Sequence, residues 1–128
     1  MIELTSLKKL QQNKYDAVWS IVRSSKPPRP GILPMPALAP TKELTEQVKR
    51  WQQQNQWTPK TFEEKYKPQY LRYLKLNENA RSLLDTLDRA DASYQKIALV
   101  CVCENPHCCH RSILAEVLKG RGCDVILS

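Results

Sequence analysis

The sequence predicts a small three-layer α/β domain, with a mostly parallel sheet of about four strands and helices on both faces. Short runs rich in β-branched residues alternate with longer stretches in which apolar residues recur at helical spacing. The connections between these runs are too long for hairpins, so they predict crossovers between parallel strands. Because 128 residues is a usual size for one domain, we expect residues 1–128 to share a single core.

The first 40 residues predict two strands and a long loop. We expect a strand at 1–4, a short helix at 6–12 and a second strand at 15–22. Residues 26–40 hold six of the nine prolines, a composition that excludes regular helix and the interior of a sheet. We interpret this proline-rich loop as a lid or binding loop, with a packed crossover as the alternative.

Three helices are predicted next, each from its start signal. Thr41 is placed as an N-cap, Thr58 precedes a proline at the first helical position, and Asn77 caps a third helix that ends near residue 91. Pro68 predicts a kink in the second helix. That helix also carries an aromatic stripe, which we interpret as core rather than as a platform for stacking bases: Phe62, Tyr66, Tyr70 and Tyr73.

The stretch that follows these helices holds the strongest functional signal of the chain. Residues 97–103 predict a buried strand, Asn105-Pro106 interrupts it, and helical spacing runs from His110 to Gly120, before a last strand that opens at Cys123. The first turn of a helix has unpaired N–H groups and partial positive charge. With Arg111 in that turn, the site suits a phosphate or carboxylate and lowers the pKa of a nearby thiol.

Composition and charge restrict the partners. The chain is 41% hydrophobic and 26% charged, as in ordinary soluble domains, and neither a signal segment nor a long apolar run is present. We therefore expect a cytoplasmic protein without membrane contact. The net charge is +7, and residues 1–75 hold 14 Lys and Arg against 6 Asp and Glu. This basic half favours a nucleotide or nucleic acid as partner, with solvated helix faces as the alternative.

Five cysteines without a secretory signal indicate free thiols in a reducing compartment. We interpret Cys101 as a small buried hydrophobic residue and Cys123 as structural. Cys103, Cys108 and Cys109 then need an explanation, and they lie close in sequence to His107 and His110.

The residue spacing of this loop fits the motifs of known cysteine-containing sites to different degrees. Cysteine-dependent phosphatases and rhodaneses place the thiolate six residues before an arginine, but the residue six before Arg111 is Asn105. The motif of zinc deaminases begins with a His or Cys that is followed two residues later by Glu, and this first half is absent from the chain. A zinc or iron–sulfur site is open to the same cysteines and histidines, although adjacent Cys108 and Cys109 are poor geometry for one chelate. We therefore expect neither a metal nor a cofactor.

A nucleophilic thiol paired with imidazole remains open, as does a purely structural interpretation. The spacing allows Cys103 or Cys109 as thiolate with His110 or His107 as base. In the structural alternative, the cysteines pack the loop against the sheet and Arg111 pairs with an acidic neighbour, Glu104 or Glu116.

The run Cys103-x5-Cys109-His110-Arg111-Ser112 resembles the hallmark of the family called domain of unknown function 488. Softer similarities cover nearly the whole chain: a strand ending in Arg23-Ser24, Leu38-Ala39-Pro40 before a helix, and Trp57-Thr58 leading into Phe62 and Tyr66. The resemblance implies that Arg23, Cys103, Cys109, His110 and Arg111 converge on one site and that Cys108 is incidental. Members include small stand-alone and phage-like proteins, which links the family to nucleotides or nucleic acid by association only.

Taken together, these features predict a site for a small anionic ligand, such as a nucleotide derivative. Arg23 and Arg111 are expected to hold the anion, with Ser24 and Ser112 beside them. His110 would transfer protons, and Cys103 or Cys109 would be the nucleophile if the ligand is processed. One alternative is a thiol or metal-binding protein. The other is a nucleic-acid-binding accessory protein that contacts phosphates through Lys8, Lys9, Lys14, Lys49, Arg50, Lys60, Lys65 and Lys67.

Overall fold

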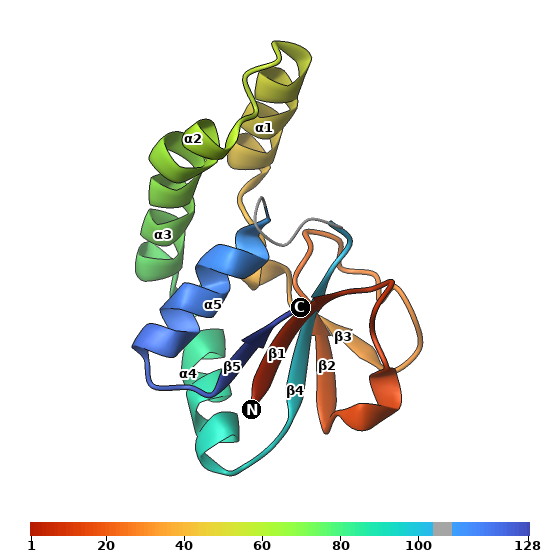
Figure 1. Cartoon of the computed structure of the whole chain (residues 1–128). Coiled ribbons are helices and arrows are strands. Elements are labelled where there is room, and N and C mark those ends of the chain that lie inside the picture. The colour runs from red at the N-terminus through yellow and green to blue at the C-terminus, as the bar shows by residue number, and fades with distance from the viewer. Residues whose placement is uncertain (104–108) are drawn as a thin grey trace.

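The computed structural model describes residues 1–103 and 109–128, which form an α/β fold around one parallel sheet (Figure 1). All strand pairs are parallel, in the order β3-β2-β4-β1-β5. The sheet has five strands where about four are expected. Their bounds are β1 Ile2–Ser6, β2 Ala17–Ser20, β3 Ile32–Pro34, β4 Ile97–Cys101 and β5 Val125–Leu127.

Strand β4 lies at the centre, and every one of its residues is buried. This is the environment that its continuous apolar run predicts. Leu99 pairs with Leu4 of β1 on one side and with Trp19 of β2 on the other. Because the three strands are parallel and in register, their carboxyl ends reach the same edge of the sheet, where ligands bind in open α/β folds.

The two faces of the sheet are covered differently. Helices α1 (Lys42–Gln53), α3 (Lys67–Leu76), α4 (Glu78–Ala92) and α5 (His110–Gly120) contribute to one cluster of buried side chains with one face of the sheet. On the opposite face, Val18, Ala98 and Val100 meet Leu10 from the segment between β1 and β2.

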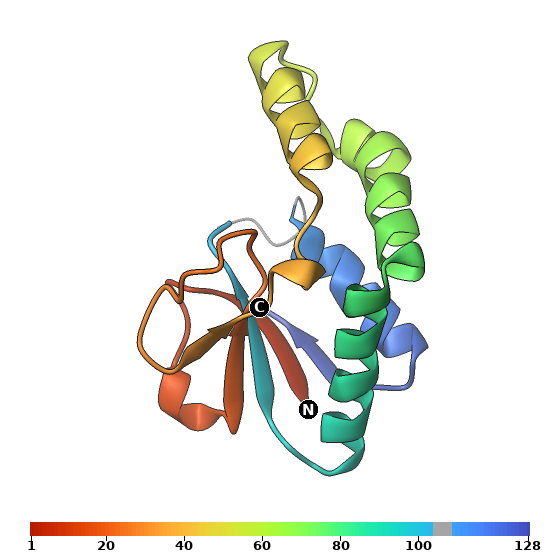
Figure 2. The same ribbon diagram turned by 180° about the vertical axis from the view of Figure 1, so that it is seen from behind.

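The expected helical layer on that second face is reduced to one short 3₁₀ helix, η1 (Gln12–Lys14). Figures 1 and 2 show η1 and the α-helices on opposite sides of the sheet. The helix predicted over 6–12 is wrong: Ser6 belongs to β1, and turns follow it. The connection from Ser6 of β1 to Ala17 of β2 is at the lower limit for a helical crossover, which takes about 10–12 residues or more.

The proline-rich loop contains the fifth strand. Strand β3 pairs only with β2, at the edge of the sheet, where Pro34 removes no hydrogen bond from an interior ladder. The 3₁₀ helix η2 (Pro36–Leu38) follows. Tyr70 and Tyr73 of α3 donate hydrogen bonds to the main-chain oxygens of Leu38 and Ala37. The second half of this loop is therefore a packed crossover.

The predicted helix starts are confirmed. Thr41, Thr58 and Asn77 each accept a hydrogen bond from the main-chain N–H three residues on. Helix α2 (Pro59–Thr61) continues through a π-helical turn, η3 (Phe62–Tyr66), into α3. Pro68 lacks an N–H and its ring crowds the carbonyl four residues back, which explains a widened turn in place of a simple kink.

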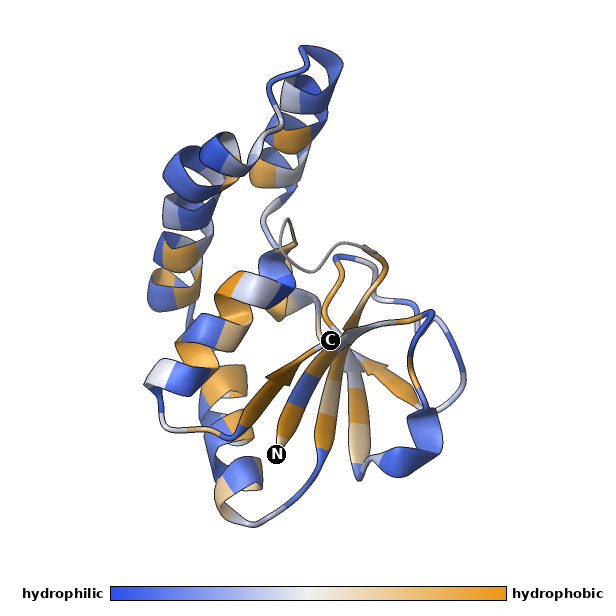
Figure 3. Cartoon of the chain, in the orientation of Figure 1, coloured by the Kyte–Doolittle hydropathy of each residue, from blue (hydrophilic) through white to orange (hydrophobic). Residues whose placement is uncertain are grey.

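Apolar residues alternate with polar ones along the helices and are frequent in the strands (Figure 3). Phe62, Tyr66 and Tyr70 are buried in the main core, as the interpretation of the aromatic stripe predicts. Helices α1 and α2 extend beyond the carboxyl edge of the sheet (Figures 1 and 2). Among the described residues, no helix is both long enough and apolar enough to cross a membrane.

Candidate functional site

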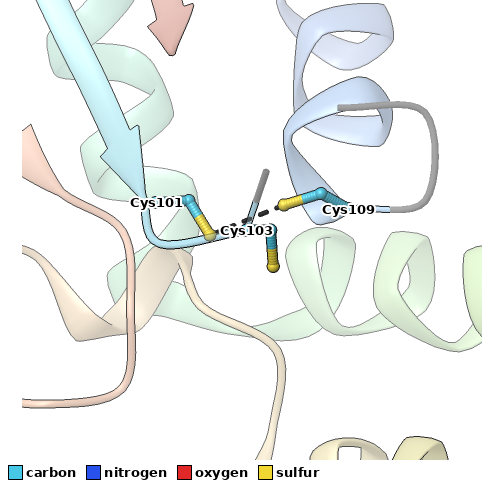
Figure 4. Close-up of side chains that lie close together, drawn as sticks. All are labelled: Cys101, Cys103 and Cys109. Atoms are coloured by element: carbon cyan, nitrogen blue, oxygen red, sulfur yellow. Dashed lines mark hydrogen bonds between the residues drawn. The ribbon is translucent and has the colours of Figure 1, made fainter. Parts of the chain in front are cut away.

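The candidate site lies at the carboxyl edge of the sheet, between the end of β4 and the start of α5. Cys101 ends β4, Cys103 follows it, and Cys109 is the N-cap residue of α5 (Figure 4). The fold therefore joins a strand end to a helix N-terminus at this point, as the sequence predicts. His107, a candidate base, lies outside the described residues, as do Glu104 and Cys108, which the family resemblance implies to be incidental.

A cavity of about 300 Å³ opens at this edge. Helix α1 forms one wall, aromatic side chains another, and the cysteines a third. Its lining residues are Val22, Arg23, Ala39, Pro40, Thr45, Val48, Gln52, Trp57, Tyr66, Cys101, Val102, Cys103, Cys109 and His110. We call this cavity the thiol pocket.

A second hollow of about 470 Å³ lies along α3, between residues such as Thr41, Gln69 and Arg72. It is larger but more open to solvent, and its lining contains no thiol or imidazole. Because binding sites combine enclosure with convergent reactive groups, the thiol pocket is the better candidate.

Three sulfur atoms meet in the thiol pocket. The Sγ atoms of Cys101, Cys103 and Cys109 all lie within 4.8 Å of one another. Those of Cys101 and Cys109 are 3.5 Å apart and share a hydrogen bond, drawn as the dashed line in Figure 4. Cys101 and Cys109 are buried, whereas Cys103 is exposed.

The short distances between the sulfur atoms give the thiols different pKa values. Hydrogen bonds from Cys101 and Cys103, with a further contribution from His110, lower the pKa of Cys109 against the opposing effect of burial. Hydrogen bonds to Cys103 and Cys109, together with burial, raise the pKa of Cys101. Since two adjacent thiolates repel each other, the cluster favours one thiolate, at Cys109, solvated by protonated neighbours.

His110 is held in one orientation by the backbone. Its Nε2 atom lies 2.8 Å from the main-chain oxygen of Ile21, which can only accept a hydrogen bond, so Nε2 carries the proton. The Nδ1 atom lies 3.5 Å from the sulfur of Cys109. The ring also meets Tyr70 edge-on, with centroids 5.7 Å apart. In the neutral imidazole, Nδ1 is thus an acceptor that can take the proton of the Cys109 thiol, and the resulting imidazolium then donates to the Cys109 thiolate, as a base beside a nucleophile requires.

Arg23 lies in the same pocket. It follows β2 and is exposed, and one of its terminal nitrogens, Nη1, donates to the main-chain oxygen of Pro40 at 3.3 Å. The structure therefore places Arg23 together with Cys103, Cys109 and His110. A guanidinium has five N–H donors, so most of its hydrogen-bonding capacity remains for a ligand.

Arg111 is placed differently from the expected anion clamp. Its side chain is fully buried and does not line the pocket. Nη2 donates to the main-chain oxygen of Cys103 at 2.6 Å, and Nη1 donates to that of Ser128 at 3.1 Å. Arg111 thus fixes the turn after β4. The alternative pairing with Glu116 does not form either, since Glu116 pairs with Lys67.

The two serines of the predicted ligand set also point elsewhere. Ser24 lies on the exposed loop and accepts a hydrogen bond from the main-chain N–H of Lys26. Ser112 donates to the main-chain oxygen of Cys109 at 3.0 Å, which steadies the first turn of α5. Neither serine lines the thiol pocket.

Some residues of the pocket were missed from the sequence. Cys101 is interpreted there as packing only, yet it lies on the helix-covered face of β4 and its sulfur faces that of Cys109. The Cys-x-Cys spacing at a strand end was the available signal. Tyr66 has a core role and lines the pocket as well. Nothing in the sequence marks Trp57 and Gln52 as pocket residues, because only the fold brings them close to the cysteines.

One comparison with known proteins gives a match. A family model described as "Active DUF488-N3 subclade" matches residues 2–122, which include Arg23 and the whole run from Cys103 to Ser112. No curated protein and no solved structure matches the chain.

Proposed function

This chain belongs to the family called domain of unknown function 488, and we propose that its thiol pocket binds a small phosphate-bearing ligand such as a nucleotide derivative. The observation that carries the proposal is the placement of Arg23 across the same cavity as Cys109 and His110. A guanidinium in the wall of a pocket that is open to solvent is suited to a phosphate group.

The size and walls of the pocket support a ligand of this kind. A cavity of about 300 Å³ is at the small end of the range for small-molecule sites. Val48, Trp57 and Tyr66 provide apolar and aromatic surface for a flat ring, and Gln52 and Thr45 add groups that donate and accept hydrogen bonds.

The pocket also has the groups for nucleophilic chemistry. The sulfur of Cys109 lies 3.5 Å from Nδ1 of His110, and the carbonyl of Ile21 fixes the proton on the other ring nitrogen. This is the arrangement of a nucleophile, a base and a group that orients the base. We assign Cys109 as the nucleophile and His110 as the base for processing of the ligand, with binding alone as the alternative.

Thermal shift of the reduced protein tests the binding proposal. The panel contains mono-, di- and cyclic nucleotides, nucleosides and sulfate. A ligand at about 100 times its Kd should add roughly 2.7 kcal/mol of stability, a shift of several degrees. We expect a nucleotide-selective shift that is lost in Arg23→Ala.

Arg72→Ala is the matched control, because it removes an arginine from the other hollow. This variant should keep the full shift. An equal shift in Arg23→Ala and the parent protein would overturn the placement of the anion. Time-dependent product formation that is absent in Cys109→Ser would separate processing from binding.

Nucleic-acid binding is the second candidate, favoured by the basic residues 1–75. In the structure, Lys67 is already paired with Glu63 and Glu116, which reduces the proposed phosphate footprint. An oligonucleotide is therefore added to the panel and titrated with salt. Affinity that falls steeply with salt would support this candidate, and affinity that is independent of salt would exclude it.

We further propose that the protein works in a reducing, cytoplasmic environment. The support is that Cys101, Cys103, Cys109 and Cys123 are all free thiols, although three of them lie close together.

A further inference from the structure

The convergence of three sulfur atoms goes beyond what a nucleophile and its base require. Cys101 and Cys103 come from the end of β4, and Cys109 comes from the start of α5. Their Sγ atoms lie within 4.8 Å of one another, and those of Cys101 and Cys109 are 3.5 Å apart. Sulfur ligands about 2.3 Å from a Zn²⁺ ion lie about 3.8 Å apart in tetrahedral geometry. The 3.5 Å separation of Cys101 and Cys109 and the 4.8 Å limit for all three sulfur atoms are compatible with this value.

We propose that Cys101, Cys103 and Cys109 together bind one thiophilic metal ion, with Zn²⁺ as the first choice. The ligand set consists of sulfur alone, which favours Zn²⁺ or Cu⁺ over Mg²⁺ or Ca²⁺. All three cysteines line the thiol pocket. The fourth coordination position of a tetrahedral ion therefore opens to the pocket, as in zinc sites that keep one position for water or a ligand.

The positive charge of Arg111 supports a metal site whose thiolates give it a net negative charge. Three thiolates exceed the charge of one Zn²⁺ by one unit, so the loaded site would be negative. Arg111 is fully buried, its Nε atom has no hydrogen-bond partner, and Nη2 bonds the main chain of Cys103. Among the residues that the structure describes, no Asp or Glu side chain pairs with Arg111. Nη1 of Arg111 also donates to the main-chain oxygen of Ser128, so the guanidinium is held beside Cys103, where its charge would offset that of a negative metal site.

The metal and the nucleophile exclude each other, because both use the sulfur lone pairs of Cys109. The loaded protein keeps Arg23 for the ligand but has no free thiolate at Cys109. Metal occupancy therefore decides whether the pocket can carry out thiol chemistry. The metal site itself does not depend on the proposed ligand.

Metal titration of the reduced, metal-stripped full chain tests the proposal, with Zn²⁺ measured by competition and Co²⁺ by its thiolate-to-metal absorption. We expect one ion per chain. Cys103→Ala should weaken Zn²⁺ binding by at least about tenfold and reduce the thiolate absorption. Cys103 is exposed, so this variant should fold. Cys101→Ser and Cys109→Ser should lose the ion as well.

Cys123→Ser is the matched control, because Cys123 is a described cysteine outside the cluster. It should bind metal as the parent protein does. The proposal is overturned if the reduced chain binds neither ion, or if Cys103→Ala keeps the affinity and absorption of Cys123→Ser. Arg23→Ala separates the two proposals, since it should lose the nucleotide shift and retain the metal.

Discussion

The surroundings of a cysteine decide whether its sulfur is reactive, and Cys123 differs from Cys109 in this respect. Cys123 donates a hydrogen bond to Asp88 at 3.3 Å. Burial and the carboxylate of Asp88 raise its pKa to about 12. At pH 8, roughly one Cys123 in ten thousand is then a thiolate. Cys123 is therefore a protected thiol, whereas the pKa of Cys109 is lowered by its sulfur neighbours.

Replacing Asp88 by Asn should make Cys123 more reactive. The acidic partner raises the pKa because it repels the thiolate, so its removal lowers the pKa and increases the thiolate fraction at a fixed pH. We expect iodoacetamide to modify Cys123 several-fold faster at pH 8 in Asp88→Asn, as measured by mass spectrometry of the Cys123 peptide.

Asp85→Asn controls for the ion pairs of Arg121, which contacts both Asp85 and Asp88. If both variants speed up the reaction equally, loosening around Arg121 is the cause, and the electrostatic explanation fails. In the parent protein, the rate should keep rising as pH increases toward 12, because the thiolate fraction continues to grow over that range.

Among the elements, the helix starts follow local chemistry and illustrate what a sequence can predict. Asn77 caps α4 through a hydrogen bond from the N–H of Ala80 at 3.0 Å. In the middle of the same helix, Thr86 donates to the main-chain oxygen of Ser82. A polar side chain that bonds the main chain is favourable at the N-cap and slightly unfavourable in the interior of a helix.

These two positions should respond to alanine with opposite signs. Asn77→Ala should destabilise the protein by about 1 kcal/mol, because the N–H groups of the first turn lose their acceptor. Thr86→Ala should be neutral or stabilise by a few tenths of a kcal/mol, because alanine has the higher helix propensity. Urea denaturation measures both. A loss of stability in Thr86→Ala as large as in Asn77→Ala would contradict the capping explanation.

The strand–loop–helix order around the cysteines could likewise be predicted, because periodicity and turn residues are local signals. The direction of the Arg111 side chain could not, since helical spacing places a residue in a turn without fixing which partner it reaches. Cys101 is buried as predicted, but its contact with Cys109 could not be predicted for a similar reason: alternation assigns Cys101 to a face of β4, and the sulfur across from it comes from another element. The reduction of the second helical layer to η1 could not be predicted either, because β1 extends to Ser6 and leaves only a minimal connection to β2.

The whole molecule brings the pocket together from segments far apart in sequence. Arg23 follows β2, Val48 belongs to α1, Trp57 precedes α2, and the cysteines belong to β4 and α5. Trp51 and Trp57 stack with centroids 5.7 Å apart, and Trp57 also meets Phe62 and Tyr66 edge-on. The same aromatic cluster thus joins the extended helices to the core.

A single cooperative core predicts that all parts of the chain unfold together. Leu99→Ala removes a fully buried side chain from the centre of the sheet and should cost about 2–5 kcal/mol. Tryptophan fluorescence reports Trp19 in the sheet, Trp51 in α1 and Trp57 between α1 and α2, and circular dichroism reports the backbone. Both signals should shift to lower urea by the same amount.

Leu33→Ala provides the comparison, because Leu33 is 50% exposed on the edge strand β3 and should cost far less. Two separate transitions, with one unaffected by Leu99→Ala, would show that the helices around α1 form an independent unit. The chain would then have two domains instead of the single one predicted.

The carbonyl of Ile21 has a consequence for how this site can change. The group that fixes the proton on His110 is a main-chain oxygen, which every residue type possesses. A substitution at position 21 can therefore leave it in place, and comparison of side chains would not reveal it. Adding or deleting one residue after β2 would instead move the oxygen away from the ring. At this point the site should tolerate changes of residue type better than changes of chain length.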